Sequence, residues 1–238
     1  MKTNLKLFCL GFAVALAAVI CAPRVEAAEP LRLVIIGDST VCDYPPDVPE
    51  RGWGQFIQGY FNDTLRVINL AKSGRSTKTF IKEGLWDKAL KEKPDFVLIQ
   101  CGHNDSHGPG KGESTDAATD YRDYLRRYID ESRAAGATLI LVTPMHRRTF
   151  GSGGKLKDIL QPYASAMKAV ASEKKVSVID LHTASGELFQ RLGDAGSAEL
   201  ANKPNDRTHF GEKGARAMAE LVMKELSKAD PRLKSELK

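Results

Sequence analysis

The sequence has few cysteines, few aromatic residues and little excess charge of either sign. Of 238 residues, four are cysteine and 7% are Phe, Trp or Tyr. The absence of any Cys-x-x-Cys pair removes the usual signature of a zinc ribbon or a dithiol redox site. The net charge is only +5, and lysine and arginine form no dense block. This balance argues against nucleic acid as a partner.

Long apolar runs are missing except at the amino terminus. Two lysines there precede an apolar run over residues 7–20, which is too short for a comfortable membrane span. Small residues at 25 and 27 then fit a signal-peptidase site. We predict a secretory signal peptide at residues 1–27, with an uncleaved anchor helix as the alternative. Residues 28–238 would form one domain, secreted or periplasmic and free of the membrane, and we expect a monomer.

Cys42 and Cys101 are the cysteines that remain after such a cleavage. Export makes a disulfide chemically possible. Both residues follow predicted strands whose ends should be neighbours in a parallel sheet. A bridge between them and a buried pair of free thiols therefore both fit the sequence.

Strand and helix patterns alternate along the chain, which is typical of a parallel sheet with helices on both faces. Short apolar runs, rich in β-branched residues, predict strands near 31–36, 66–70, 95–100, 138–142 and 176–180. Apolar residues at helical spacing predict helices near 53–61, 77–90, 115–135, 160–173, 187–192 and 214–227. The predicted fold is α/β, a three-layer α/β/α sandwich with a five-stranded parallel sheet.

The first predicted strand leads directly into Gly37-Asp38-Ser39-Thr40. Other polar clusters follow later strands or precede the last helix, namely Gly74, Gly102-His103-Asn104-Asp105 and Asp206-Arg207-Thr208-His209. Because right-handed connections return parallel strands in one direction, their carboxyl ends share one edge of the sheet, where ligands of such folds bind. We therefore expect these clusters to meet.

The residue types in these clusters fit nucleophilic catalysis. A serine needs a base to take its proton and a third group to orient that base. His209 is the candidate base for Ser39, and Asp206 lies close enough in the chain to orient its ring. Backbone N–H groups of Ser39 and Gly74 and the amide of Asn104 are candidate donors to a developing oxyanion. Each signal alone is ordinary in loops, whereas the joint pattern, in this order and at these strand ends, favours nucleophilic catalysis by Ser39.

These segments resemble the blocks of the SGNH, or GDSL, hydrolase superfamily, and most closely its rhamnogalacturonan acetylesterase branch, carbohydrate esterase family twelve. The resemblance spans about residues 31–226 and rests on Gly37-Asp38-Ser39-Thr40-Val41, Gly52-Trp53-Gly54-Gln55, Gly74-Arg75-Ser76, Gly102-His103-Asn104-Asp105, Thr143-Pro144-Met145-His146-Arg147-Arg148 and Asp206-Arg207-Thr208-His209-Phe210. It departs at Cys101, where an aromatic residue is more usual.

The resemblance implies a flavodoxin-like SGNH hydrolase fold, with Ser39 as the nucleophile, Asp206 and His209 completing a triad, and Gly74 and Asn104 in the oxyanion hole. It implies a serine esterase that needs no cofactor and removes O-acetyl groups from plant cell-wall polysaccharide, with rhamnogalacturonan of pectin as the first candidate. The alternatives are a short-chain lipase or thioesterase, another carbohydrate O-acetylesterase acting on xylan, sialate or the cell envelope, and a non-catalytic carbohydrate-binding relative.

Arginines and a tryptophan near these blocks are candidate substrate contacts. Arg147 and Arg148 suit the carboxylate of an acidic sugar, or else are solvated loop charges. Trp53 either stacks on a sugar or closes the core, and the core is favoured. His103 and His107 have the spacing of helical metal ligands, but the glycines and proline that follow predict a loop, so no metal site is expected and His103 is expected to pack beneath the site.

Overall fold

The computed structural model describes residues 29–238, so the predicted signal peptide lies outside the described residues. Five parallel strands form one sheet in the order β2-β1-β3-β4-β5. In chain order they are β1 Leu31–Gly37, β2 Leu65–Asn69, β3 Phe96–Gln100, β4 Thr138–Val142 and β5 Ser177–Ile179. The predicted α/β fold and its five-stranded parallel sheet are confirmed.

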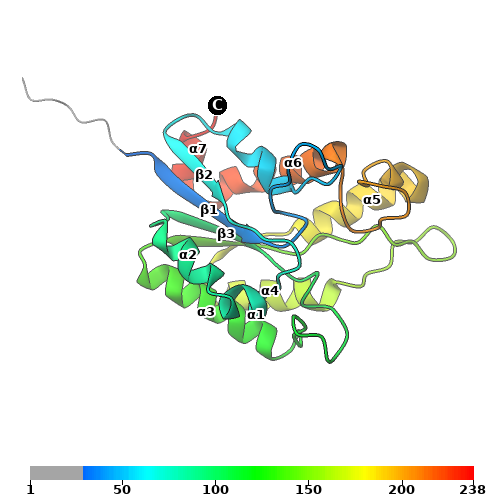
Figure 1. Cartoon of the computed structure of the whole chain (residues 1–238), viewed down its shortest axis with the longest axis horizontal. Coiled ribbons are helices and arrows are strands. Elements are labelled where there is room, and N and C mark those ends of the chain that lie inside the picture. The colour runs from blue at the N-terminus through cyan, green and yellow to red at the C-terminus, as the bar shows by residue number, and fades with distance from the viewer. Residues whose placement is uncertain (1–28) are drawn as a thin grey trace, which may run out of the picture.

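Helices cover both faces of the sheet (Figure 1). One layer holds α1 Thr77–Lys82, α2 Leu85–Lys91, α3 Asp120–Ala134 and α4 Gln161–Lys174. The other holds the 3₁₀ helix η1 Trp53–Tyr60 together with α5 Leu181–Ala198, α6 Glu212–Ala229 and α7 Pro231–Ser235. Alternate residues of β1 point to opposite layers, with Leu33 and Ile35 in one apolar core and Val34 and Ile36 in the other. Burial on both faces explains why the strand is continuously apolar from Leu33 to Ile36.

Strand order places a topological switch point between β1 and β3. The chain leaves β1 for β2 on one side and leaves β3 for β4 and β5 on the other. The register pairs Gly37 at the end of β1 with Gln100 at the end of β3. In open α/β sheets the crevice beyond the strand ends at such a point is the usual ligand site. The loops after β1 and β3 therefore open side by side onto one crevice.

Several helix boundaries differ from the sequence prediction, and glycines explain two of them. Gly84 has φ +68°, which ends α1 and separates it from α2 within the range predicted as one helix. Gly193 likewise has φ +68° and kinks α5. That helix begins at Leu181, well before the predicted start, because the Asp180 carboxylate accepts the Thr183 N–H at its amino end. The short helix α7 is not predicted.

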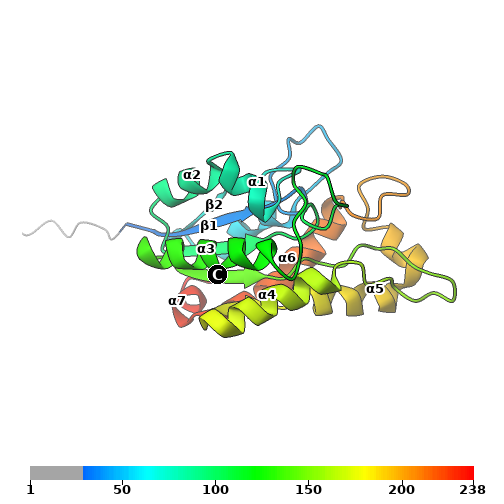
Figure 2. The same ribbon diagram turned by 90° about the horizontal axis from the view of Figure 1, so that it is seen from below.

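The long loop between β4 and α4, residues 143–160, extends beside α5 at the end of the molecule where the strands end (Figures 1 and 2). Gln190 of α5 fastens it: its Oε1 accepts Leu156 N at 3.0 Å, and its Nε2 donates to the Gly154 carbonyl at 2.9 Å. Within residues 29–238, none of the helices combines the length and apolar character needed to cross a membrane.

Candidate active site

Ser39, His209 and Asp206 form a continuous hydrogen-bonded chain. Ser39 follows β1, whereas Asp206 and His209 lie in the loop between α5 and α6. Ser39 Oγ lies 2.9 Å from His209 Nε2, and His209 Nδ1 lies 3.0 Å from Asp206 Oδ2. Because a carboxylate only accepts, Nδ1 carries the proton and Nε2 presents its lone pair to the hydroxyl. The juxtaposition that the sequence predicts is present.

The Asp206 carboxylate is fixed by its own loop. Its Oδ1 accepts the backbone N–H groups of Thr208 and His209, each at 2.8 Å. Burial alone would raise the pKa of Asp206, but these N–H groups and the His209 ring outweigh it and leave the pKa below its usual value. The carboxylate is therefore ionised beside an imidazole that would gain charge by taking the serine proton.

A buried hydrogen-bond network fixes the turn that presents Ser39. Asp38 Oδ1 accepts Thr40 N at 2.8 Å and Thr40 Oγ1 at 2.7 Å. Gln100 Nε2 donates to Thr40 Oγ1, and Gln100 Oε1 accepts Trp53 Nε1–H, both at 2.8 Å. Gln100 at the end of β3 thus ties the turn after β1 to η1, a role that the sequence alone does not show.

Trp53 is wholly buried at the start of η1. With no exposed ring surface Trp53 cannot stack on a sugar, so the prediction that it contacts substrate is wrong and the favoured core interpretation is correct. Its indole N–H is satisfied by Gln100, as a buried tryptophan requires. The residue acts on the site through that hydrogen bond.

His103 lies beneath the triad, as predicted. Its Nδ1 lies 3.3 Å from Asp38 Oδ2, and both side chains are buried. Burial lowers the pKa of His103, and the negative charge of Asp38 offsets this effect only in part. Burial would raise the pKa of Asp38, but His103 and the Thr40 hydrogen bonds outweigh it. His107 instead pairs with Glu113 at 2.7 Å on the surface, so the two histidines have different partners.

The two remaining candidate oxyanion donors lie in the loops after β2 and β3. Gly74 has φ +78°, a conformation that favours glycine, and its loop is held to the end of β1 by Lys72 N–H bonded to the Gly37 carbonyl at 3.0 Å. Asn104 Nδ2 donates one hydrogen to the Arg75 carbonyl at 3.0 Å. Its second amide hydrogen is left for a ligand, and the bond to Arg75 fixes the orientation of the amide beside Gly74.

Asp105 joins the same two loops from below. This buried carboxylate accepts Thr77 N–H at 3.1 Å and Thr115 Oγ1–H at 3.0 Å, and it also accepts the Thr77 hydroxyl. Burial raises the pKa of Asp105 to about 6. Asp105 forms no hydrogen bond with the triad residues. It links the start of α1 to the loop that carries Asn104.

Arg148 is buried against the triad loop. Its Nη2 donates to the carbonyls of Asp206 at 3.0 Å and His209 at 2.7 Å. The guanidinium carbon lies 4.3 Å from the centre of the Phe210 ring, and burial lowers the pKa of the group to about 10. The prediction that Arg148 pairs with a sugar carboxylate is wrong, because a guanidinium with no exposed surface holds the triad loop instead.

Arg147 also braces the site, with partial exposure. It donates to the His103 carbonyl at 3.1 Å and to the Thr208 hydroxyl. It thus bridges the loop after β3 and the triad loop. Its role as a substrate contact stays a prediction.

The cysteines and the cleft complete the description. Cys42 and Cys101 are buried free thiols, so of the two alternatives left by the sequence the structure has the unbridged pair. A cleft of about 260 Å³ opens beside Asp206 and His209 of the triad, and its other lining residues are Tyr44, Glu50, Ser73 and Lys203. The His209 side chain is 36% exposed there, so a substrate reaches the imidazole edge from solvent.

The fold and the Ser–His–Asp arrangement at its switch point are those of a carboxylic ester hydrolase. Comparison with known families agrees: the chain belongs to the GDSL-like Lipase/Acylhydrolase family, whose model matches residues 35–217. The fold and the family therefore confirm the resemblance drawn from the motifs.

Two relatives in Bacillus subtilis match most of the chain. The probable rhamnogalacturonan acetylesterase YesY is 37% identical over 198 residues, which cover 81% of this chain and 91% of the relative. The rhamnogalacturonan acetylesterase RhgT is 35% identical over 224 residues, covering 88% and 95%. Among solved structures, the Bacillus subtilis protein YxiM superposes with a TM-score of 0.74 at 30% identity, over 84% of this chain and 56% of that one.

A second solved structure supports the fold alone. The acetylxylan esterase Axe2 of Geobacillus stearothermophilus, as a catalytic mutant, gives a TM-score of 0.65 at 22% identity, covering 83% of this chain and 94% of that chain. Its sheet and helices correspond to those described above, which places the present chain in the same α/β architecture.

Proposed function

We propose that this chain is a serine acetylesterase that removes O-acetyl groups from rhamnogalacturonan, the acidic polysaccharide of pectin. The carrying observation is the Ser39–His209–Asp206 chain of hydrogen bonds, at the edge of the sheet where the loops with Gly74 and Asn104 also follow their strands. The names of two relatives that match most of the chain support the substrate class. The predicted signal peptide belongs to the same proposal, with the protein acting as a monomer in the periplasm or the medium.

In the proposed reaction Ser39 Oγ attacks the acetyl carbonyl while His209 Nε2 takes its proton. Asp206 stabilises the imidazolium that forms. The oxyanion of the tetrahedral intermediate accepts hydrogen bonds from the N–H groups of Ser39 and Gly74 and from the free amide hydrogen of Asn104. His209 then returns the proton to the sugar hydroxyl as it leaves, which produces acetyl-Ser39.

Deacylation repeats these steps with water. His209 removes a proton from a water molecule as it attacks acetyl-Ser39, and the same donors stabilise the second oxyanion. Collapse of this intermediate breaks the bond to Ser39 Oγ, which regains its proton from His209. Acetate is released and the triad returns to its starting state.

Xylan is the second candidate polymer, because an acetylxylan esterase of Xylanibacter ruminicola is 27% identical over 84% of this chain, although the match covers only 43% of that relative. Acetate release from equal acetyl loads of rhamnogalacturonan and xylan separates the two. We expect faster release from rhamnogalacturonan and none with Ser39→Ala on either polymer. Faster release from xylan overturns the substrate assignment, and binding without release overturns the esterase itself.

A further inference from the structure

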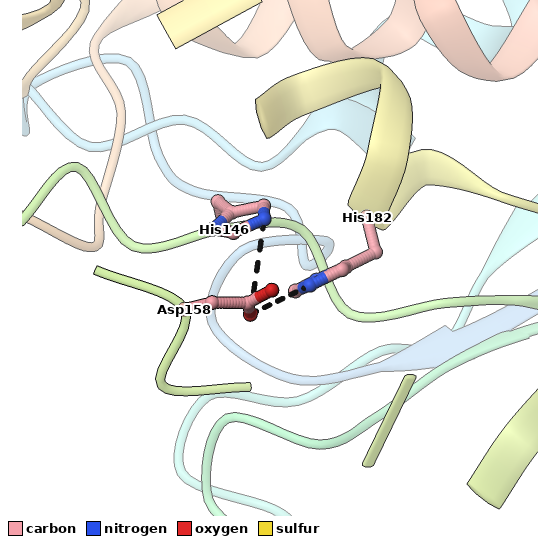
Figure 3. A group of neighbouring side chains, drawn as sticks. All are labelled: His146, Asp158 and His182. Atoms are coloured by element: carbon pink, nitrogen blue, oxygen red, sulfur yellow. Dashed lines mark hydrogen bonds and ion pairs between the residues drawn. The ribbon is translucent and has the colours of Figure 1, made fainter. Parts of the chain in front are cut away.

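Three side chains outside the proposed catalytic machinery converge beside α5. His146 and Asp158 lie in the loop between β4 and α4, and His182 lies in the first turn of α5 (Figure 3). One nitrogen or oxygen from each lies within 4.8 Å of the other two. Neither the mechanism nor the sequence motifs use this group as a unit, so its chemistry needs its own account.

The hydrogen bonds of His182 determine which ring nitrogen faces Asp158 as an acceptor. His182 Nδ1 lies 2.9 Å from the Pro144 carbonyl, which can only accept, so Nδ1 carries a proton. In the neutral ring Nε2 then presents a lone pair, and it lies 2.9 Å from Asp158 Oδ1. Two acceptors at this distance need a positive charge between them, either a second proton or a metal ion. Histidines that bind metals commonly donate their other N–H to a backbone carbonyl, as His182 does.

His146 brings a second imidazole to the same carboxylate. Its Nε2 lies 3.8 Å from Asp158 Oδ1, and its ring stacks on that of His182 with centroids 3.9 Å apart and an angle of 19°. Both imidazoles bind a metal ion in their neutral form.

The spacing and the donor set suit zinc. Zinc bound at about 2.0–2.1 Å in a tetrahedral site separates its ligand atoms by about 3.3 Å. This value lies between the 2.9 Å from His182 Nε2 to Asp158 Oδ1 and the 3.8 Å from His146 Nε2 to the same oxygen. Two imidazoles with one carboxylate favour zinc over calcium or magnesium, which prefer oxygen. Asp158 is 44% exposed, which leaves a fourth position open to water. Because an imidazole lone pair lies in the ring plane, binding requires the stacked rings to open.

We propose that His146, Asp158 and His182 bind one divalent transition metal ion of the zinc class, which fastens the β4–α4 loop to α5. Besides the hydrogen bond between His182 and the Pro144 carbonyl, the loop is joined to this helix by His146 N–H, which donates to Ser185 Oγ at 3.0 Å, and by Gln190 near the tip of the loop. His146 directly precedes Arg147 and Arg148, the residues that brace the triad loop. The metal ion would thus stabilise the segment on which the position of the triad depends.

The test is zinc titration of tag-free, chelator-treated protein by isothermal calorimetry, with magnesium in parallel. We expect one zinc ion per chain, a higher Tm with zinc, and no comparable effect of magnesium. Asp158→Asn, in an exposed loop, should weaken zinc binding by more than about tenfold. His146→Gln should do the same and serves as the second variant.

The matched control is His107→Gln, which removes a histidine from an exposed His–carboxylate pair elsewhere and should leave zinc affinity unchanged. Zinc bound instead at the triad would persist in Asp158→Asn and disappear in His209→Asn. That outcome, the absence of saturable binding, or equal affinities of Asp158→Asn, His146→Gln and the parent protein would overturn the proposal.

Discussion

Single residues at this site depend on partners contributed by distant segments. Asn104 shows this most clearly, because one of its amide hydrogens is fixed on the Arg75 carbonyl at 3.0 Å and the other is free. The anchored hydrogen sets the direction of the free one. An amide held in this way needs no reorganisation when charge develops on the substrate, which is what gives an oxyanion donor its large effect.

Asn104→Ala is expected to lower kcat for a small acetyl ester about 100- to 1000-fold, because one donor to the oxyanion is lost. KM should change far less, since the interaction forms in the transition state. Steady-state kinetics measure both. Ser106→Ala is the control: this hydroxyl bonds the His103 carbonyl in the same loop and should change kcat only a few-fold. Equal losses in the two variants would count against the role of Asn104.

Arg148 is the positioning residue with the sharpest expectation. Arg148→Met keeps the volume but leaves the carbonyls of Asp206 and His209 without their donor, so we expect a loss of about 1–3 kcal/mol in unfolding free energy and a 10- to 100-fold lower kcat from the displaced imidazole. Urea unfolding and kinetics measure these. Arg207→Met, which removes a surface charge paired with Asp194, should change stability by about 0.5 kcal/mol or less. A kcat unchanged in Arg148→Met would refute the positioning role.

At the scale of elements, the loops after β3 and β4 pack tightly, with the Pro144 ring against the backbone of Gly102. Gly102, just after β3, has φ +143°, and an added Cβ would lie 2.7 Å from Pro144 Cγ in the loop after β4. A larger residue therefore conflicts both with its own backbone and with the neighbouring loop. This packing brings the loop that carries Asn104 next to the loop that carries Arg147 at the carboxyl edge of the sheet.

Gly102→Ala should lower the free energy of unfolding by roughly 1–3 kcal/mol, from backbone strain together with overpacking. Urea denaturation followed by circular dichroism gives the value. Gly112→Ala provides the comparison, because a Cβ there meets nothing within 4 Å and its φ is not positive; we expect a change within about 0.5 kcal/mol. A loss of equal size at both positions would contradict this account of the loop packing.

The elements could be predicted where a local pattern decides them and not where tertiary contacts do. β1 is predictable because its central residues are buried on both faces and are therefore apolar. The triad is predictable because Ser39, Asp206 and His209 flank elements whose direction is fixed by right-handed connections. Arg148 is not, because a charged side chain is buried only when distant carbonyls receive it. Nor is the group of His146, Asp158 and His182, whose spacing matches no local motif and which meets only because the loop after β4 lies along α5.

For the whole molecule, two buried titratable groups act on stability in opposite directions over nearly the same pH range. Burial raises the pKa of Asp105 to about 6 from an ordinary value of 3.8. The folded protein therefore keeps a proton that the unfolded chain releases, so the contribution of Asp105 to the free energy of unfolding falls as pH rises from about 4 to 6. In the metal-free chain, burial and then the neighbouring His182 lower the pKa of His146 to about 4 from an ordinary value of 6.5. His146 therefore stays neutral where the unfolded chain takes up a proton, so its contribution to the free energy of unfolding falls as pH drops through that range. The two slopes oppose each other.

Asp105→Asn should remove the contribution of Asp105 to the pH dependence of the unfolding free energy and leave that of His146. The stability of the variant should then rise more steeply between pH 4 and 6 than that of the parent protein, by up to about 1.4 kcal/mol per pH unit. Urea unfolding at a series of pH values measures the slope independently of any uniform loss of stability. Parallel curves for the two proteins would show that Asp105 does not titrate in this range.

The central claim concerns Ser39, and labelling with a fluorophosphonate tests it most directly. The reagent phosphonylates an activated serine, so intact-protein mass spectrometry should show one label per chain, peptide mapping should place it on Ser39, and acetate release should fall in proportion. Ser39→Ala should take up no label and release no acetate. Label on another residue, or substantial acetate release by Ser39→Ala, would contradict the account.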